Sequence, residues 1–138
     1  FQMSGVVAVS EAVSLAFHGM GLLASGRRMS AKEMAETVKV SEAHLAKVFQ
    51  RLVKEGLVAS TRGPGGGFEL AKDPEEVTLL HIYTVIEGLP RAEHCLLHSD
   101  TCPFGTCIFG SMLEKMTGEF VEYLKNTTLA DLQRGETR

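Results

Sequence analysis

The fold can be worked out from residues 53–71, which read Val-Lys-Glu-Gly-Leu-Val-Ala-Ser-Thr-Arg-Gly-Pro-Gly-Gly-Gly-Phe-Glu-Leu-Ala. Gly56 ends a preceding helix, a short strand begins at Leu57, and a second strand returns from Phe68. The turn between them, Arg62–Gly67, holds four glycines and one proline, which leave its backbone free to approach another molecule closely. A hairpin directly after two short helices is typical of a winged helix-turn-helix, a fold that reads duplex DNA. An ordinary glycine-rich hairpin in an unrelated domain is the alternative.

The helices that precede the hairpin carry clear capping signals. Ser30 and Glu33 form a capping box, because each side chain satisfies a free backbone N–H, and they open a helix that reaches about Val38. Ser41 caps the second helix. The buried stripe of this second helix is Leu45, Val48, Phe49 and Leu52. Ahead of both, apolar residues at helical spacing predict an amphipathic helix over residues 10–25.

After the hairpin, the sequence predicts two more helices. Thr78 caps the first of them, which Gly88 closes, and a longer one resumes near Ile108. The apolar residues on one side of the longer helix are Phe109, Met112, Leu113, Met116, Phe120, Tyr123 and Leu124. Such a stripe can pack on its own domain or on a second copy of the chain. Residues 127–138 read as a polar tail with a weak pair of leucines, Leu129 and Leu132.

The expected fold class is mainly α with a small β-hairpin, a winged helix-turn-helix followed by a long C-terminal dimerisation helix. Residues 3–88 are expected to form the DNA-binding domain, residues 89–107 a cysteine-containing loop, and residues 108–132 the dimerisation helix and C-terminal segment. Residues 1–2 are expected to be a tag remnant. No apolar run reaches the roughly 18 residues of a membrane span, and no secretory signal is visible, so we expect a cytoplasmic protein. We do not expect an enzyme, because the sequence shows no plausible nucleophile–base pair, no phosphate-binding glycine loop that opens a helix and no paired catalytic carboxylates.

The charge of the chain is distributed unevenly. The net charge is −3, but residues 27–72 carry nine Lys and Arg against five acidic residues, a net of +4, and residues 73–138 carry a net of −6. Phosphate affinity depends on the local patch rather than on the total. The asymmetry therefore supports nucleic-acid binding by the first half of the chain.

The predicted DNA-contacting residues lie on the second short helix and in the hairpin turn. They are Ser41, Glu42, His44, Lys47 and Arg51 on the helix, and Arg62, Gly63 and Gly65 in the turn. His44 and Lys47 can donate to guanine or phosphate, and Glu42 can accept from cytosine. Arg62, at the tip of the hairpin, suits a narrow and strongly negative minor groove. Each of these charges could equally be solvated surface.

The cysteines form a second candidate site. Cys95, Cys102 and Cys107 lie in one thirteen-residue segment with the spacing C-x6-C-x4-C. Their odd number argues against a disulfide framework, and three thiols in one loop indicate a metal or cluster site. The spacing is neither that of a zinc finger nor that of bacterial ferredoxins. His94 and His98 are the nearest candidates for a fourth ligand. Free thiols, a regulatory disulfide and zinc bound by three cysteines and one histidine all stay open.

Residues 27–88 resemble the Rrf2 family of bacterial winged-helix regulators, which contains IscR and NsrR. The shared features are Ala31-Lys-Glu-Met-Ala-Glu36, Val40-Ser41, Leu45 through Leu52, Gly56-Leu-Val58, Arg62-Gly-Pro-Gly-Gly-Gly67 and Pro74 to Gly88. With the first helix, the cysteine segment and Thr128-Leu-Ala-Asp-Leu132, the resemblance covers almost the whole chain. It implies a homodimer held by the long C-terminal helices, which binds a palindromic promoter site.

The resemblance also implies that Cys95, Cys102 and Cys107 hold a 2Fe–2S or 4Fe–4S cluster. In IscR-like members a histidine lies three residues after the third cysteine, where this chain has Gly110. In NsrR-like members an acidic residue near the start of the first helix, donated by the partner subunit, completes the site. This chain has Ser10 at that position and Glu11 one residue later. The fourth ligand is open among Glu11, His94, His98 and an exogenous group.

We therefore expect a dimeric transcriptional regulator whose promoter affinity is controlled by an iron–sulfur cluster. The signal would be nitric oxide, redox state or cluster supply. One alternative keeps the DNA-binding module and replaces the cluster with a thiol/disulfide or zinc switch. A second alternative is a small redox protein on a winged-helix scaffold, which would not bind DNA selectively.

Overall fold

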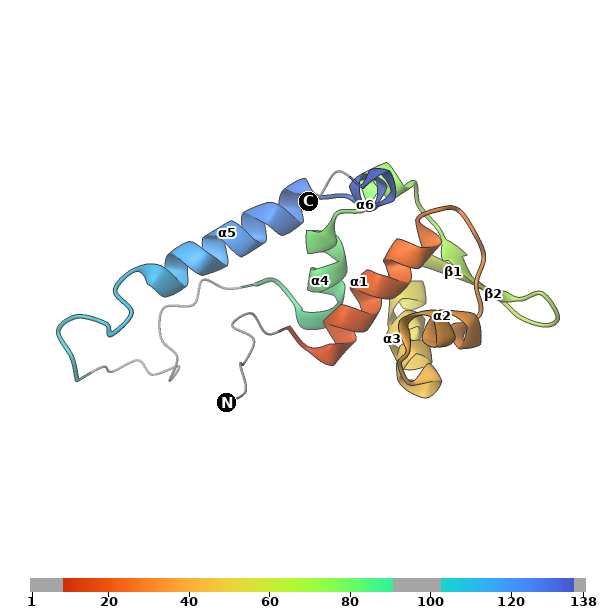
Figure 1. Ribbon diagram of the computed structural model, residues 1–138, viewed down its shortest axis with the longest axis horizontal. Coiled ribbons are helices and arrows are strands. Elements are labelled where there is room, and N and C mark those ends of the chain that lie inside the picture. Colours follow the sequence, from red (N-terminus) through yellow and green to blue (C-terminus); the bar gives the residue numbers. More distant parts are fainter. Residues whose placement is uncertain (1–8, 91–102, 136–138) are drawn as a thin grey trace.

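The computed structural model describes residues 9–90 and 103–135, which form a helical body with a hairpin that projects from one end (Figure 1). The elements in chain order are α1 (Glu11–Leu23), α2 (Ala31–Val38), α3 (Glu42–Lys54), β1 (Val58–Thr61), β2 (Gly67–Leu70), the 3-10 helix η1 (Pro74–Glu76), α4 (Leu79–Glu87), α5 (Met112–Asn126) and α6 (Leu129–Arg134). The expected fold class, mainly α with a small β-hairpin, is confirmed.

α2 and α3 form the helix-turn-helix, and side-chain caps set where each helix begins. The Ser30 hydroxyl accepts from the backbone N–H of Glu33, and the Glu33 carboxylate accepts from the backbone N–H of Ser30, which completes the predicted capping box. The Ser41 hydroxyl accepts from the backbone N–H of His44 and starts α3. Between the helices Lys39 has a φ of 58°. This left-handed residue ends α2 and turns the chain into α3.

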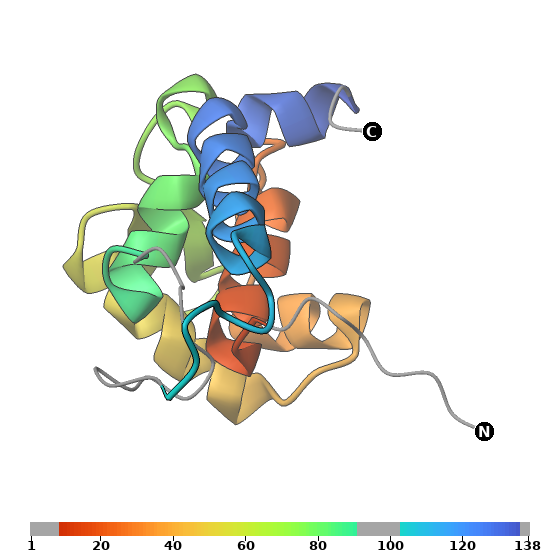
Figure 2. The same cartoon turned by 90° about the vertical axis from the view of Figure 1, so that its left-hand side faces the viewer.

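α1 runs through the middle of the body and packs against α3 and α4 (Figures 1 and 2). The contact with α3 depends on Gly19, because a Cβ there would lie 2.4 Å from Cζ of Phe49. Phe49 is fully buried, so its ring rests directly on the backbone of α1. The other fully buried large side chains are Met20, Leu23, Met34, Leu45, Leu52, Leu57, Ile82, Leu124 and Leu129. This single core fixes the position of α3 relative to the hairpin.

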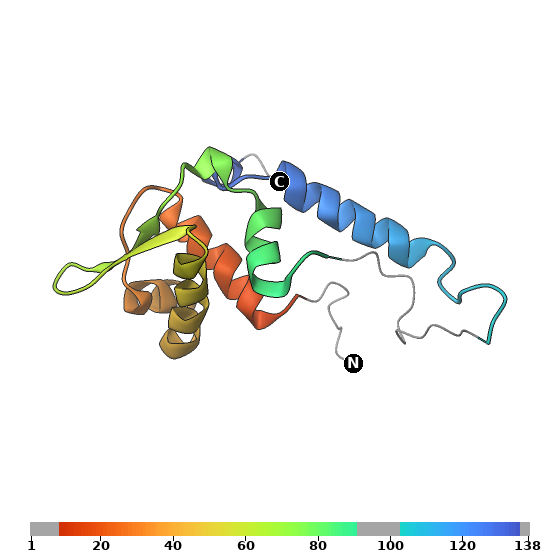
Figure 3. The same ribbon diagram turned by 180° about the vertical axis from the view of Figure 1, so that it is seen from behind.

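The hairpin of β1 and β2 is the wing, and its base is held from two sides. β1 and β2 pair antiparallel. On the other edge of β2, Met29 and Phe68 exchange two backbone hydrogen bonds, of 3.0 and 2.7 Å. The Phe68 ring packs against Phe49 of α3 with ring centroids 5.4 Å apart. The turn beyond this base projects away from the body (Figures 1 and 3).

The prediction of a polar tail from Thr127 onward is wrong, because α6 lies there. Thr128 and Asp131 form a capping box, and Leu129 is fully buried. Backbone hydrogen bonds also tie this segment to the residues before α4: the N–H of Leu129 donates to Val77 at 3.0 Å. A six-residue helix is too short to show a periodic apolar pattern, so its burial was not visible in the sequence.

α5 begins at Met112, later than the start predicted near Ile108. Its C-terminal half packs on α4, where the rings of Tyr83 and Phe120 meet edge to face with centroids 6.0 Å apart. Leu124 is buried in the same contact region. The N-terminal half extends away from the body, at the end opposite the wing (Figures 1 and 3).

Candidate nucleic-acid interface and cysteine segment

The first turns of α3 present polar side chains to solvent, as a recognition helix does. Glu42 and Lys47 are exposed and His44 is partly exposed. Leu45, between them, is fully buried, so the polar and apolar faces of α3 are cleanly separated. The structure therefore leaves three of the predicted base-contacting residues at least partly accessible to another molecule.

Two of the predicted DNA-contacting residues have partners inside the protein. Nδ1 of His44 lies 3.2 Å from Oε1 of Glu11, at the start of α1. Nη2 of Arg51 donates to the backbone carbonyl of Val85 in α4, at 3.1 Å. Arg51 thus ties α3 to the C-terminal end of α4, which gives it a structural role beside the predicted phosphate contact. The contact with Glu11 brings a candidate cluster ligand against the start of the recognition helix.

The tip of the wing is exposed and carries one cation. Arg62 is exposed, and within the described part of the chain it makes no hydrogen bond or ion pair. Gly63 and Gly65 have φ values of 88° and 73°, a left-handed conformation that suits glycine. The described geometry leaves the guanidinium of Arg62 free to meet another molecule.

A groove separates the wing from α3, with a volume of about 400 Å³. Its lining residues are Gln50, Val53, Ser60, Arg62 and Phe68. Gln50 was not among the residues predicted to contact DNA. The available signal was its spacing, because Gln50 follows Lys47 by three residues and so continues the same exposed face of α3.

The cysteine segment lies mostly outside the described residues, which is the case for Cys95, Cys102, His94 and His98. Cys107 is a free cysteine and is partly buried, just ahead of α5. Within residues 9–90 and 103–135, no group of three His, Cys, Asp or Glu side chains could hold a metal ion. The predicted ligand set therefore stays a prediction, and Cys107 is its one member among the described residues.

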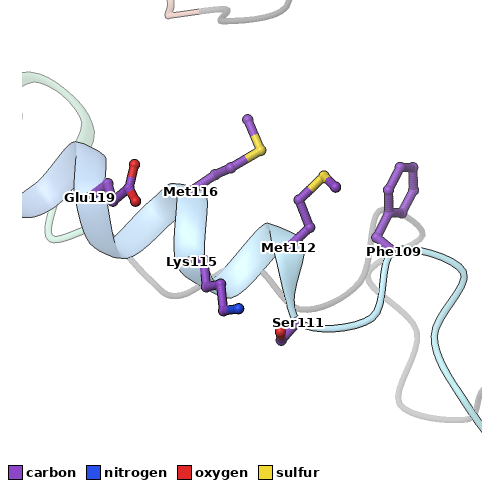
Figure 4. A pocket seen from close by; sticks show the side chains of 6 residues that line it. All are labelled: Phe109, Ser111, Met112, Lys115, Met116 and Glu119. Carbon is purple, nitrogen blue, oxygen red and sulfur yellow. The ribbon is translucent and has the colours of Figure 1, made fainter.

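The start of α5 carries a row of exposed apolar side chains. Phe109, Met112 and Met116 point to the same side of the helix (Figure 4). Met112 is 54% exposed and Met116 43%, and these residues line a shallow hollow of about 330 Å³. Tyr123, farther along α5, is also exposed. A monomer that leaves such a row uncovered loses the free energy that its burial would contribute.

The Rrf2 family profile, described as an iron-dependent transcriptional regulator, matches residues 9–135. A helix-turn-helix-type transcriptional regulator of Aquifex aeolicus (strain VF5) is 34% identical over 128 residues, which cover 89% of this chain and 89% of that protein. The regulator IscR of Serratia proteamaculans (strain 568) is 34% identical over 101 residues, which cover 72% of this chain. The match spans 61% of the length of that IscR, less than two thirds.

Solved structures with the same fold include two kinds of regulator. CymR, described as the global cysteine regulator of B. subtilis, has a TM-score of 0.74 and 29% identity, covering 92% of this chain and 96% of CymR. IscR of T. potens has a TM-score of 0.73 and 29% identity, covering 95% of this chain and 89% of that IscR. The oxidized form of Staphylococcus aureus CymR has a TM-score of 0.67 and 25% identity, covering 89% of this chain and 93% of that CymR.

The described helices of this chain are all too short or too polar to cross a lipid bilayer.

Proposed function

The chain belongs to the Rrf2 family of helix-turn-helix transcriptional regulators, and on this premise we propose that it binds a palindromic promoter site as a homodimer. The observation that carries the proposal is the exposed face of α3 beside a projecting wing, in a chain that matches the family profile over residues 9–135. Its curated relatives are transcriptional regulators. The sequence resemblance to this family is thereby confirmed.

The proposed mode of binding places α3 in the major groove and the wing over the adjacent minor groove. Glu42, His44 and Lys47 then face base edges, and the helix N-terminus at Ser41 faces a phosphate. Arg62 enters the minor groove, where the negative potential is strongest when the groove is narrow. Gly63 and Gly65 carry no side chain that would hold the turn away from the DNA.

The exposed row on α5 supports the homodimer. Two copies of Phe109, Met112 and Met116 can cover each other across a two-fold axis, because an isologous interface buries the same patch of both subunits. The wing and the start of α5 lie at opposite ends of the body (Figure 1). Pairing through α5 therefore leaves both wings free for the two half-sites of a palindrome.

Selection of duplexes from a random-sequence library by the full chain tests the proposal. We expect the enriched sequences to share an inverted repeat, with half-sites separated by about one helical turn of DNA or a multiple of it. Arg62→Ala is expected to weaken binding of the selected duplex by about tenfold. Enrichment of no common sequence, together with equal binding of all duplexes, would argue for the small redox protein instead.

We further propose that Cys95, Cys102 and Cys107 hold an iron–sulfur cluster whose presence sets the DNA affinity. Support comes from the iron-dependent description of the family profile and from the likeness to IscR. The donor chemistry fits in the part that is described, because Cys107 is a free, only partly buried cysteine whose thiolate could ligate iron. A bound cluster would supply a redox-active and nitric-oxide-reactive group at the start of α5.

The contact between Glu11 and His44 supports a coupling between that group and the DNA. Glu11 is a candidate fourth ligand, and in the described state its carboxylate is 3.2 Å from Nδ1 of His44. A Glu11 carboxylate engaged elsewhere leaves His44 free to turn toward a base or phosphate. A change in the binding partner of Glu11 thus reaches the recognition helix through one side chain.

Anaerobic reconstitution with iron and sulfide tests the cluster, with Cys102→Ala as the comparison. The wild type is expected to become brown and to contain both iron and sulfide, and Cys102→Ala to stay colourless. If both proteins bind the selected duplex with the same affinity before and after reconstitution, the cluster does not control DNA binding.

A thiol switch is the second candidate, because the similar structures include the cysteine regulator CymR and an oxidized form of CymR. The free, partly buried Cys107 is compatible with it. This candidate predicts a colourless protein after reconstitution and a DNA affinity that changes with a thiol oxidant. Zinc bound by the same thiols would be colourless too, but its removal by a chelator would change the affinity without an oxidant.

A further inference from the structure

Arg28 lies in the segment between α1 and α2 and contacts the wing at two points. Its Nη1 donates to the carbonyl oxygen of Gly65, in the turn, at 3.4 Å. Its Nη2 donates to Oε1 of Glu69, on β2, at 3.1 Å. The contacts join positions that are 37 and 41 residues apart in the chain. No local sequence pattern could indicate them.

The backbone next to Arg28 brings its guanidinium within reach of the turn. Met29 forms the bridge to Phe68 on the outer edge of β2. Gly67 lies so close that a Cβ there would be 2.6 Å from the carbonyl oxygen of Met29. The segment is thus fastened to the base of the wing, and the side chain of Arg28 extends from it past the base toward the tip.

The tip has little else to hold it. A Cβ added at Gly63 or Gly65 would meet no atom within 4 Å, so neither position packs against a neighbour. Within the turn, the N–H of Gly66 donates to Gly63 at 2.9 Å. Glycines have more backbone freedom to lose than other residues, and a loop that is ordered only on binding costs affinity. A contact that orders the tip beforehand reduces that cost.

We propose that Arg28 is a positioning residue that holds the wing in place so that Arg62 reaches the minor groove. This inference rests on the proposed function, because it assumes that the wing contacts DNA. Arg28 acts here through its bonds to Gly65 and Glu69 and not by touching the DNA. Both members of the pair with Glu69 are well exposed, at 43% and 37%, and exposed pairs contribute little to global stability. Its loss should therefore affect the wing and not the fold.

A double-mutant cycle with Arg28→Gln and Arg62→Ala tests the proposal. The full chain binds the duplex that the wild type selects, and the affinity is measured by fluorescence anisotropy. We expect Arg28→Gln to weaken binding about three- to tenfold in the wild-type background, but less than about twofold when Arg62→Ala is already present. The melting temperature of Arg28→Gln should match that of the wild type.

The cycle separates this role from a direct phosphate contact, whose loss would weaken binding equally in both backgrounds. Arg27→Gln is the matched control. It removes the same charge from the same segment, but Arg27 pairs with Glu33 of α2 and not with the wing. Glu69→Ala adds a test of sign: it removes a negative charge, which alone would strengthen DNA binding, yet we expect it to weaken binding. Faster hydrogen exchange at the wing amides of free Arg28→Gln is also expected.

Two outcomes overturn the inference, and they differ in what else fails. If Arg62→Ala weakens binding but the effect of Arg28→Gln is additive to it or absent, the positioning role is wrong and the wing still contacts DNA. If Arg62→Ala leaves the affinity unchanged, the proposed role of the wing fails, and the inference fails with it. Stronger binding by Glu69→Ala would also contradict the positioning role.

Discussion

At the scale of single residues, the glycines of the wing have two different reasons to be glycine. At Gly65 the reason is the backbone angle alone, with a φ of 73° and open space around it. At Gly67 the reason is also contact, since a Cβ would lie 2.6 Å from the carbonyl oxygen of Met29. A backbone atom cannot give way as the end of a side chain can. The two positions therefore make a matched pair.

We expect Gly67→Ala to destabilise the protein more than Gly65→Ala. The left-handed backbone costs an alanine at Gly65 about 1–2 kcal/mol. At Gly67 the displaced contact with Met29 adds about 1–3 kcal/mol, the usual range for an overpacked site. Urea unfolding followed by circular dichroism measures both variants. Equal losses would mean that the wing moves away from Met29 without cost.

Also at the residue scale, Glu11→Gln is expected to strengthen DNA binding by protein without a cluster by about two- to fivefold. The change removes a negative charge from the side of the recognition helix and leaves His44 free of its carboxylate partner. Anisotropy titrations at two salt concentrations measure the effect. Glu33→Gln is the control, because Glu33 is also acidic and exposed but contacts Arg27. If Glu11→Gln and Glu33→Gln strengthen DNA binding equally, the contact between Glu11 and His44 does not restrain the recognition helix.

At the scale of elements, the sequence predicted those helices that begin at a side-chain cap, because a cap is a local sequence signal. Ser30 with Glu33, Ser41 and Thr78 each cap a helix where the sequence places it. The wing was equally clear, because its glycine-rich turn is local. α6 was missed, since its burial depends on Val77 and on α1, which are far away in the chain. The contacts of Arg28 with the wing have the same long-range origin.

α6 is predicted to contribute strongly to stability through Leu129. This side chain is fully buried, and its removal leaves a cavity in the core. We expect Leu129→Ala to lower the free energy of unfolding by about 2–5 kcal/mol. Leu132→Ala is the comparison, because Leu132 is only partly buried and should cost less. Thermal or urea unfolding measures both variants. If both lose equally little stability, α6 does not contribute to the core, as the sequence prediction of a polar tail had it.

The start of α6 is also expected to make stability depend on pH. The backbone N–H of Thr128 donates to the Asp131 carboxylate at 2.9 Å, and Arg134 donates to it at 2.7 Å. These bonds lower the pKa of Asp131 below its ordinary value. A lowered pKa in the folded state means that the stabilisation is present above the unfolded pKa, about 4, and is lost as pH falls through the folded pKa. The wild type should therefore exceed Asp131→Asn in stability at neutral pH, and the difference should shrink in acid. A difference independent of pH would contradict this.

At the scale of the whole molecule, the wing and the first half of α5 lie at opposite ends of an elongated body (Figure 1). The basic part of the sequence, residues 27–72, contains α2, α3 and the wing, and the acidic remainder contains α5. DNA would therefore meet one end of the molecule while the other end stays free for a second subunit. The cluster site at the cysteines stays a prediction, because only their spacing and the family resemblance support it. Spacing along the chain does not say how three thiols converge.

Disruption of the row on α5 tests this division of the molecule. We expect Met116→Glu to yield a monomer, because each subunit would bury a charge in the interface at a cost that exposed apolar contacts cannot offset. Affinity for the full palindrome should fall by about 100-fold or more, as linked binding to the second half-site is lost, while affinity for a single half-site stays the same. Sedimentation velocity and anisotropy with full and half-site duplexes measure both. Glu114→Lys is the control, since two residues along a helix place it on another face of α5. A Met116→Glu protein that remains a dimer with unchanged affinity would place the subunit contact elsewhere.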